Sequence, residues 1–292
     1  MTEVPGVPSP STVTPALTRG PASFRCNESG IPGQARGDGE DLASAKTLTQ
    51  AKSRQTAIGL ALAALIAGAW AAIHVGGIFF WSWTPASVLP AAALVLIQAW
   101  LSTGLFIVAH DAMHGSLAPG RPRLNRLAGT ISLGMYAGLS YRRLLPKHHL
   151  HHRHVGTAED PDFSADHPRS APRWFLVFFR TYYTHAQLGR ITVVAIGYLL
   201  LGASLLNIAI FWAVPALLAL AQLFFFGTYL PHRHDDAPFL DKHRARSTGV
   251  GPLLSLLTCY HFGGYHHEHH LSPGTPWWAL PRYRRDRASA PS

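Results

Sequence analysis

Two long stretches of the chain carry almost no charge. Between Arg54 and Arg121 the only formally charged residue is Asp111, and from Ile191 to His232 there is none. Each stretch is much longer than the ~20 apolar residues that cross a bilayer once. The hydrophobic pattern therefore predicts at least two passes through a membrane in each stretch.

Each stretch is divided by a segment suited to a turn. The first is interrupted at Trp81–Pro85, an uncharged aromatic segment typical of a membrane interface, and the second near Gly202–Asn207. The spans of the first hairpin are expected at about Thr56–Phe80 and Val88–Ala109. We predict an all-α integral membrane protein with four transmembrane helices in two hairpins.

Three shorter apolar segments remain outside these spans. Their length and their Gly or Arg content favour interfacial or re-entrant helices over further spans. They are Leu124–Leu139, Trp174–Tyr183 and Gly251–Phe262.

The charges point to the membrane orientation. The chain has a net charge of +10 and only 14% charged residues, against ~25% in an average soluble domain. The basic residues flank the apolar stretches and both hairpin tips lack charge, so the positive-inside rule predicts that both termini and the long connections face the cytoplasm, at the inner membrane. This arrangement also argues against nucleic-acid binding, which needs a shared basic face. The flanking residues are Lys46, Lys52, Arg54, Arg121, Arg123, Arg126, Arg190, Arg233, Lys242, Arg244 and Arg246.

The ends of the chain differ in composition from its middle. The N-terminal segment is rich in Pro, Gly, Ser and Thr and has no apolar run, so we expect a disordered tail over residues 1–50 and no signal peptide. A catalytic domain is expected at 51–284 and a short tail at 285–292. Cys26 and Cys259 belong to no disulfide or C-x-x-C pattern and are interpreted as incidental.

Eight histidines form three patterns at the margins of the apolar stretches. Residues three and four apart share a helix face, so each pattern can present its imidazoles together. His149 and His267 fall outside this register, because the positions that would complete it are Arg153 and Leu271. The three patterns are His110 with His114, His148 with His151 and His152, and His266 with His269 and His270. They predict a cytoplasmic, histidine-rich helical cap.

Eight imidazoles exceed the four ligands that satisfy one zinc, so two metal ions are expected. Imidazole suits Fe, Zn and Cu alike, and the zincin motif H-E-x-x-H is absent because Leu271 stands where its second histidine would be. A loose histidine-rich tract is the alternative, but one spacing recurring at separate membrane edges argues against it. His232 is expected to be a ninth ligand, with His234 as the alternative and His261 a weaker candidate.

The residues around the histidines resemble those of bacterial-type beta-carotene ketolases, within the membrane fatty-acid desaturase and hydroxylase superfamily. The resemblance spans roughly Leu60 to Tyr283. It is carried by His110–Gly115, His151–His154 with Asp160–Phe163, Phe226–Arg233, and Tyr265–Pro273 followed by Pro276–Trp278.

The resemblance implies a four-span helical protein with a non-haem di-iron centre held by the eight histidines and one more. It would oxidise the C4 and C4′ methylenes of beta-ionone rings with O₂. It also makes Asp111, Asp160 and Asp162 candidates for catalysis or for orienting ligands, with helix capping or turn formation as the alternative.

The implied chemistry is two hydroxylations of one allylic carbon, followed by loss of water from the gem-diol. Each round consumes two electrons. The chain has no dinucleotide, haem or iron–sulfur motif, so a separate donor such as a ferredoxin is expected.

Two further interpretations of the chain remain open. The first is a fatty-acyl desaturase or a carotenoid hydroxylase, which share this scaffold. The second is a membrane metal-binding or transport protein, but such a protein would carry ionisable residues within its spans, and these spans are almost without charge. The aromatic runs Phe224–Phe226 and Trp277–Trp278 fit lipid-facing packing better than a carotenoid tunnel.

Overall fold

The computed structural model describes residues 35–289, with side chains from residue 46 onward. The disorder expected for residues 1–34 lies outside the described residues, as do residues 290–292. Helix α1 (Ala35–Phe80) begins inside the expected tail 1–50, where nine of the 16 residues from Ala35 to Gln50 are Ala, Leu, Arg, Glu, Lys or Gln, which favour helix. Helix α12 (Leu280–Ala288) likewise continues past the expected boundary at residue 285.

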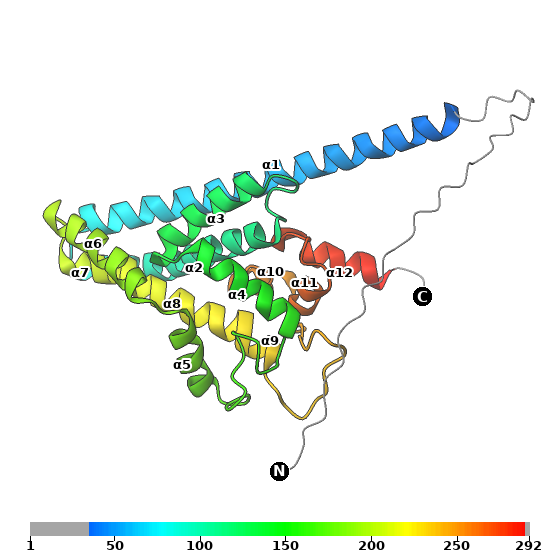
Figure 1. Ribbon diagram of the computed structural model, residues 1–292. Coiled ribbons are helices and arrows are strands. Elements are labelled where there is room, and N and C mark those ends of the chain that lie inside the picture. Colours follow the sequence, from blue (N-terminus) through cyan, green and yellow to red (C-terminus); the bar gives the residue numbers. More distant parts are fainter. Residues whose placement is uncertain (1–34, 290–292) are drawn as a thin grey trace, which may run out of the picture. The chain divides into compact units, whose positions relative to one another are not determined.

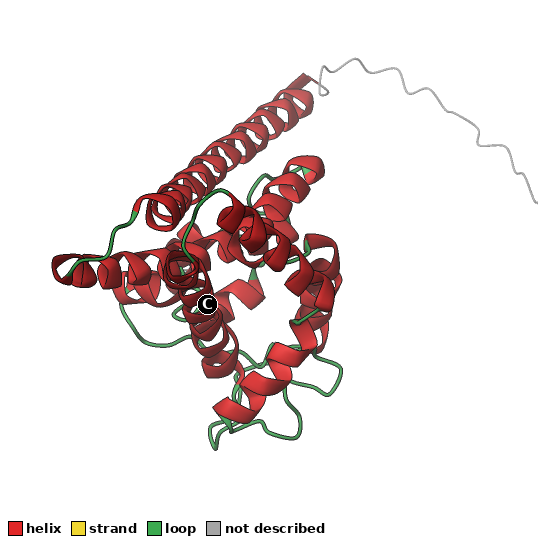
Figure 2. Cartoon of the chain, turned by 90° about the vertical axis from the view of Figure 1, so that its left-hand side faces the viewer, coloured by secondary structure: helices red, strands yellow, loops and turns green. Residues whose placement is uncertain are grey.

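Every regular element in the described part of the chain is a helix (Figures 1 and 2), which confirms the all-α prediction. Residues from Lys46 onward form one compact unit. The remaining helices are α2 (Val88–His114), α3 (Pro122–Ala137), α4 (Tyr141–His154), α5 (Ala171–Tyr182), α6 (His185–Leu200), α7 (Leu205–Ile208), α8 (Val214–Gln222), α9 (Leu230–His232), α10 (Pro252–Cys259) and α11 (His266–Leu271), with short turns η1 (Pro85–Ser87) and η4 (Trp277–Ala279).

Three helical stretches among the described residues are long and apolar enough to cross a membrane: Lys46–Phe80, Pro85–His114 and Leu205–His232. Two of their limits agree with the expected spans, since α1 ends at Phe80 and α2 begins at Val88. The expected third span is α6, whose 16 residues rise only ~24 Å, less than the ~30 Å of a bilayer core. The prediction of four spans is therefore not confirmed.

The stretch Leu205–His232 is one continuous helix with two wider turns. Its segments η2 (Ala209–Ala213) and η3 (Leu223–Tyr229) are π-helical. Such insertions are rare and often lie at functional sites. Here η3 leads directly into α9, which ends at His232.

Helix α2 is the centre of the fold. It packs against α3 and α8, and nearly every residue from Gln98 to Met113 is buried. A helix that is apolar on all sides belongs in such a central position. It ends at Gly115, whose φ of 72° is the left-handed conformation of a helix C-cap.

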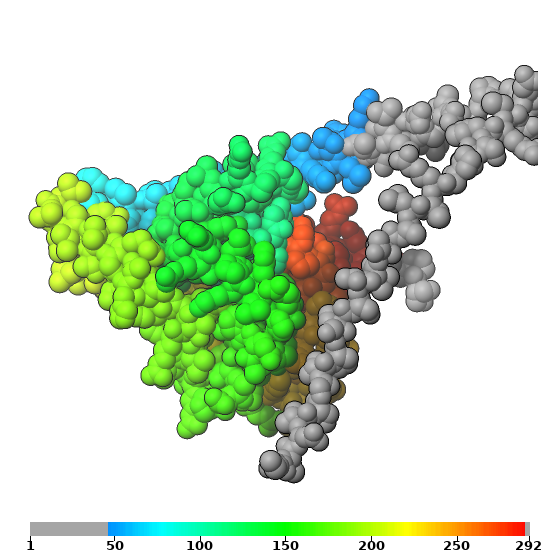
Figure 3. Space-filling view, viewed as in Figure 1, coloured from blue at the N-terminus to red at the C-terminus, as the bar shows by residue number. Residues whose placement is uncertain are grey.

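The start of α4 is anchored to the end of α2. The Tyr141 hydroxyl donates to the Ala112 carbonyl at 2.9 Å. Gly129 of α3 makes room for this ring, because a Cβ there would lie 2.3 Å from it. Figure 3 shows the green segments of α3 to α5 forming a continuous surface on one face.

The three expected short apolar segments are helical, as predicted, and form α3, α5 and α10. Their interfacial placement stays a prediction.

Candidate metal centre

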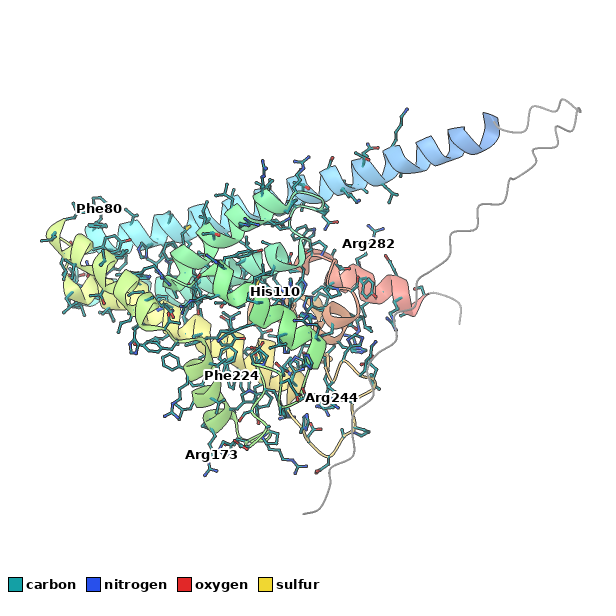
Figure 4. All side chains as sticks on the ribbon, viewed as in Figure 1. Phe80, His110, Arg173, Phe224, Arg244 and Arg282 are labelled. Carbon is teal, nitrogen blue, oxygen red and sulfur yellow. The ribbon has the colours of Figure 1, made fainter. Side chains whose placement is uncertain are left out.

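Nine buried or half-buried histidines converge near the centre of the bundle, where Figure 4 labels His110. They form two groups, and within each group the ligand atoms lie within 4.8 Å of one another. The five-histidine group is His110, His114, His148, His152 and His269, and the four-histidine group is His151, His232, His266 and His270. These are the nine residues that the sequence singled out.

Two short helices each contribute to both groups. On α4, His148 and His152 turn to the five-histidine group while His151 turns to the other. On α11 the sharing is reversed, since His269 joins the five-histidine group and its two partners join the other. The H-x-x-H-H spacing thus makes each helix a bridge between two adjacent sites. The sites touch where the rings of His152 and His270 stack at 4.3 Å.

The ring nitrogens face one another inside each group. The Nε2 atoms of His114 and His148 lie 2.6 Å apart, and those of His152 and His269 lie 3.1 Å apart. In the other group, His266 Nε2 lies 2.8 Å from that of His232 and 3.1 Å from that of His270. Nitrogens at right angles around one ion, at ~2.1 Å from it, stand about 3 Å apart. The donor sets therefore fit one metal ion each.

The opposite ring nitrogens are held by the protein in three cases. His151 donates from Nδ1 to the Asp160 carboxylate at 2.9 Å. His232 donates to the Arg244 carbonyl at 2.9 Å and His266 to the Phe262 carbonyl at 3.1 Å. Such bonds fix the tautomer so that Nε2 is free for a metal. All three belong to the four-histidine group.

Three other ligands have no such support. The Nδ1 atoms of His110, His269 and His270 are buried without a hydrogen-bond partner among the described residues. His270 belongs to the four-histidine group, and the other two belong to the five-histidine group, in which no Nδ1 hydrogen bond is formed among the described residues. The five-histidine group is therefore held less firmly by hydrogen bonds than its neighbour.

Burial keeps most of these imidazoles neutral. It lowers the pKa of His148, His266, His269 and His270 well below the ordinary value. Only a neutral imidazole binds a metal, so at neutral pH these histidines can bind metal ions without first losing a proton. Burial alone would also lower the pKa of His151, but Asp162 and Asp160 together raise it.

The predicted carboxylates fall in two places. Asp160 and Asp162 lie beside His151, at 2.9 and 3.7 Å from its Nδ1. Asp162 also accepts a hydrogen bond from the Tyr182 hydroxyl, and burial raises the pKa of its carboxyl.

Asp111 belongs to neither histidine group. Its carboxylate accepts from the Trp277 backbone N–H at 3.1 Å, so it ties the end of α2 to η4. This contact is a structural one, and a catalytic role for Asp111 stays a prediction.

The other candidate histidines lie outside both groups. His234 packs between Phe163 and Phe239 instead. His149 contacts the Met113 carbonyl, and His267 pairs with Asp241 at 2.8 Å. His261 is buried beside Trp277, where burial lowers its pKa to about 4.

An apolar cavity of about 560 Å³ opens on both groups. One face of the helix Leu205–His232 lines it from Leu205 to Thr228, a rise of roughly 34 Å. Small residues three or four positions apart, including Ala209, Ala213 and Ala216, leave space for the cavity along this face. The cavity is thus long and mostly apolar, with Asp162, Tyr182 and Gln187 among the few polar residues of its wall besides the histidines.

The aromatic runs do not line this cavity, but the expectation that they face lipid is wrong for Phe224 and Trp277, which are buried; Phe225 is exposed. Phe224 packs with Trp174 and Tyr229, and Trp277 packs against Tyr260. The small residues of the 205–228 face were not anticipated. Their three- and four-residue spacing was the available signal.

Most of the chain is similar in sequence to known proteins. The fatty acid desaturase family model matches residues 85–195 and 180–291. A beta-carotene ketolase of Paracoccus sp. (strain PC1) is 49% identical over 235 residues, which cover 79% of this chain and 93% of that protein. A second, from Paracoccus sp. (strain N81106 / MBIC 01143), is 46% identical and covers 80% and 95%. A zeaxanthin 4-ketolase of Chlamydomonas reinhardtii is 38% identical, covering 78% of this chain and 53% of its own length.

Proposed function

The chain belongs to the fatty acid desaturase family, and we propose that it is a beta-carotene ketolase. It converts the C4 methylenes of beta-ionone rings to ketones, taking beta-carotene through echinenone to canthaxanthin. The observation that carries this proposal is the long apolar cavity that ends at two adjacent histidine groups. Its dimensions suit an extended polyene with one ring at the histidines.

We propose that each histidine group holds one iron, in a catalytic domain that covers residues 51–284. When bound, two irons supply the activation of O₂. Iron is chosen because an all-imidazole donor set accepts it and because inserting oxygen into a C–H bond requires a redox-active metal, which zinc is not.

The cavity walls orient the polyene and exclude water. The face from Leu205 to Thr228 holds the polyene lengthwise, so that C4 of the leading ring approaches the histidines. Exclusion of water protects reactive species from side reactions. Asp160 orients His151, while Asp162 and Tyr182 lie at the cavity wall beside it.

The reaction balances as two equal rounds. In each, the C4–H bond, one O₂, two electrons and two protons give C4–OH and one water. The second round gives a gem-diol, which loses water to leave the ketone. The electrons come from a separate donor protein, such as a ferredoxin.

We further propose that the protein lies in the inner membrane with both termini and the metal centre on the cytoplasmic side. The ligands of α2 and α9 lie at the ends of two apolar helices flanked by basic residues, as the positive-inside rule requires. Helix α6 would complete the second hairpin, because it buries none of its residues and exposes Val193, Ile196 and Leu200.

The test is expression in bacteria that accumulate beta-carotene, with pigment analysis. Echinenone and canthaxanthin are expected from the chain and neither from its His266→Ala variant. Zeaxanthin alone would instead indicate a carotenoid hydroxylase, and altered acyl chains a desaturase. Purified protein that holds zinc and consumes no O₂ would indicate a metal-binding protein.

A further inference from the structure

The loop between α9 and α10 carries an arginine with unusual backbone geometry. Arg244 has a φ of 41°, in the left-handed region that non-glycine residues avoid. Such a conformation persists only where the surroundings impose it, and it is common at functional sites. Figure 4 labels Arg244 outside the bundle core, in the loop that follows α9.

The backbone of Arg244 orients one ligand of the four-histidine group. Its carbonyl accepts the hydrogen bond from His232 Nδ1 at 2.9 Å. This bond leaves Nε2 of the same ring directed at His266 Nε2, 2.8 Å away. The carbonyl therefore sets both the tautomer and the direction of His232.

The side chain of Arg244 reaches the support of a second ligand in the same group. Its Nη1 donates to the Gly156 carbonyl at 3.0 Å. The N–H of Gly156 donates to the Asp160 carboxylate at 2.9 Å, and that carboxylate accepts from His151 Nδ1. Gly156 has a φ of 66°, and a Cβ there would lie 3.3 Å from Arg244 Cδ.

We propose that Arg244 is a positioning residue that holds the four-histidine group together, by joining the supports of His232 and His151 in one loop. The proposal rests on the proposed function only in taking this group to hold a metal ion. No such link reaches the five-histidine group within the described residues, where His110 and His269 lack partners at Nδ1. The two sites are thus unequal, and Arg244 affects one of them.

The test compares two arginines of the same loop in the full chain, purified in detergent and loaded with ferrous iron. Arg244→Ala removes the bond to Gly156. Arg246→Ala is the matched control, because its guanidinium bonds the Arg233 and Ala237 carbonyls and pairs with the Asp235 carboxylate, and none of these groups accepts a hydrogen bond from a ligand histidine. Iron per chain is measured together with the rate of iron removal by a chelator.

The iron content of Arg244→Ala is expected to fall by half while Arg246→Ala keeps the full complement. Loss of a residue that orients ligands typically weakens metal binding about 10–100-fold. Arg244→Lys, which keeps a donor, is expected to lose one half of its iron to the chelator faster than the wild type does. If Arg244→Ala does not fold, this biphasic loss decides the question.

Equal iron loss in both alanine variants would overturn the proposal, since the loop would then act only through general stability. So would full iron retention and single-phase release in both Arg244 variants. Neither result touches the proposed function, which is judged by whether the wild type forms ketone. Wild-type protein that binds no iron would refute both.

Discussion

Replacing Gly104 by alanine is expected to destabilise the protein, against the usual preference of helices. Gly104 lies in the buried part of α2 and faces Tyr260. An added Cβ would lie 2.4 Å from the phenol oxygen and 2.5 Å from the ring carbon that bears it. The ring cannot move away easily, because it is fully buried, stacks on Trp100 at 4.5 Å and belongs to a residue with a φ of 47°.

Two opposing effects determine the magnitude. Alanine in place of a helical glycine stabilises by ~0.5–1 kcal/mol, whereas one methyl group forced into a packed core costs ~1–3 kcal/mol. The 2.4 and 2.5 Å contacts place the packing cost at the upper end, ~2–3 kcal/mol. The net loss is then about 1–2.5 kcal/mol, and the Tm falls by roughly 2–10 °C. The disturbance should also reach the metal centre, because two residues beyond Tyr260 the Phe262 carbonyl supports His266.

The assay is thermal unfolding of the detergent-solubilised protein, followed by tryptophan fluorescence. Gly68→Ala on α1 is the control, since no atom lies within 4 Å of its added Cβ, and its Tm should not fall. In a Tyr260→Leu background most of the cost of Gly104→Ala should disappear, as coupling between contacting residues requires. A rise in Tm for Gly104→Ala, or an undiminished cost in that background, would refute the reasoning.

Three further predictions concern the site. His148→Ala should lose iron and ketone formation. His149→Ala should keep most of both in a pigment assay with iron analysis, because its ring lies outside both histidine groups, contacts the Met113 carbonyl and reaches the His114 ring only at 6.1 Å. Lowering the pH from 7 to 5 should reduce Tm and release iron. The histidines of the unfolded chain take up protons near pH 6.5, whereas burial lowers the pKa of the folded imidazoles, that of His261 to about 4. Each such group costs roughly 1 kcal/mol of stability per pH unit below 6.5, and a Tm that does not change with pH would contradict this. Ala216→Phe should block the cavity and abolish ketone formation at normal protein levels, while Ala221→Phe, on the exposed side of the same helix, should remain active.

The helical class and some helix limits, such as the end of α1 and the start of α2, could be predicted from hydrophobicity alone. Length and apolar composition identified α1, α2 and the helix that ends at His232. The third span is not confirmed, because an uncharged stretch does not show where its helix begins and ends, and α6 has only 16 residues. Helix α6 ends at Leu200, directly before the turn at Gly202, whose φ of 90° suits glycine.

The ligand candidates were also accessible from sequence, because helical periodicity puts residues three and four apart on neighbouring positions of one face. That rule selected His148 over His149 and His266 over His267. It could not divide the nine histidines into five and four. The division depends on how α2, α4, α9 and α11, which come from distant parts of the chain, are oriented around one another.

The sequence alone determined which histidines are candidate ligands, since residue type and spacing are local properties. Tertiary structure alone decided what surrounds them. The cavity along residues 205–228 is lined by several helices from distant parts of the chain, and the bond from the Trp277 N–H to the Asp111 carboxylate joins residues 166 positions apart. Arg244 reaches Gly156 across 88 residues of chain, a contact that no local pattern encodes.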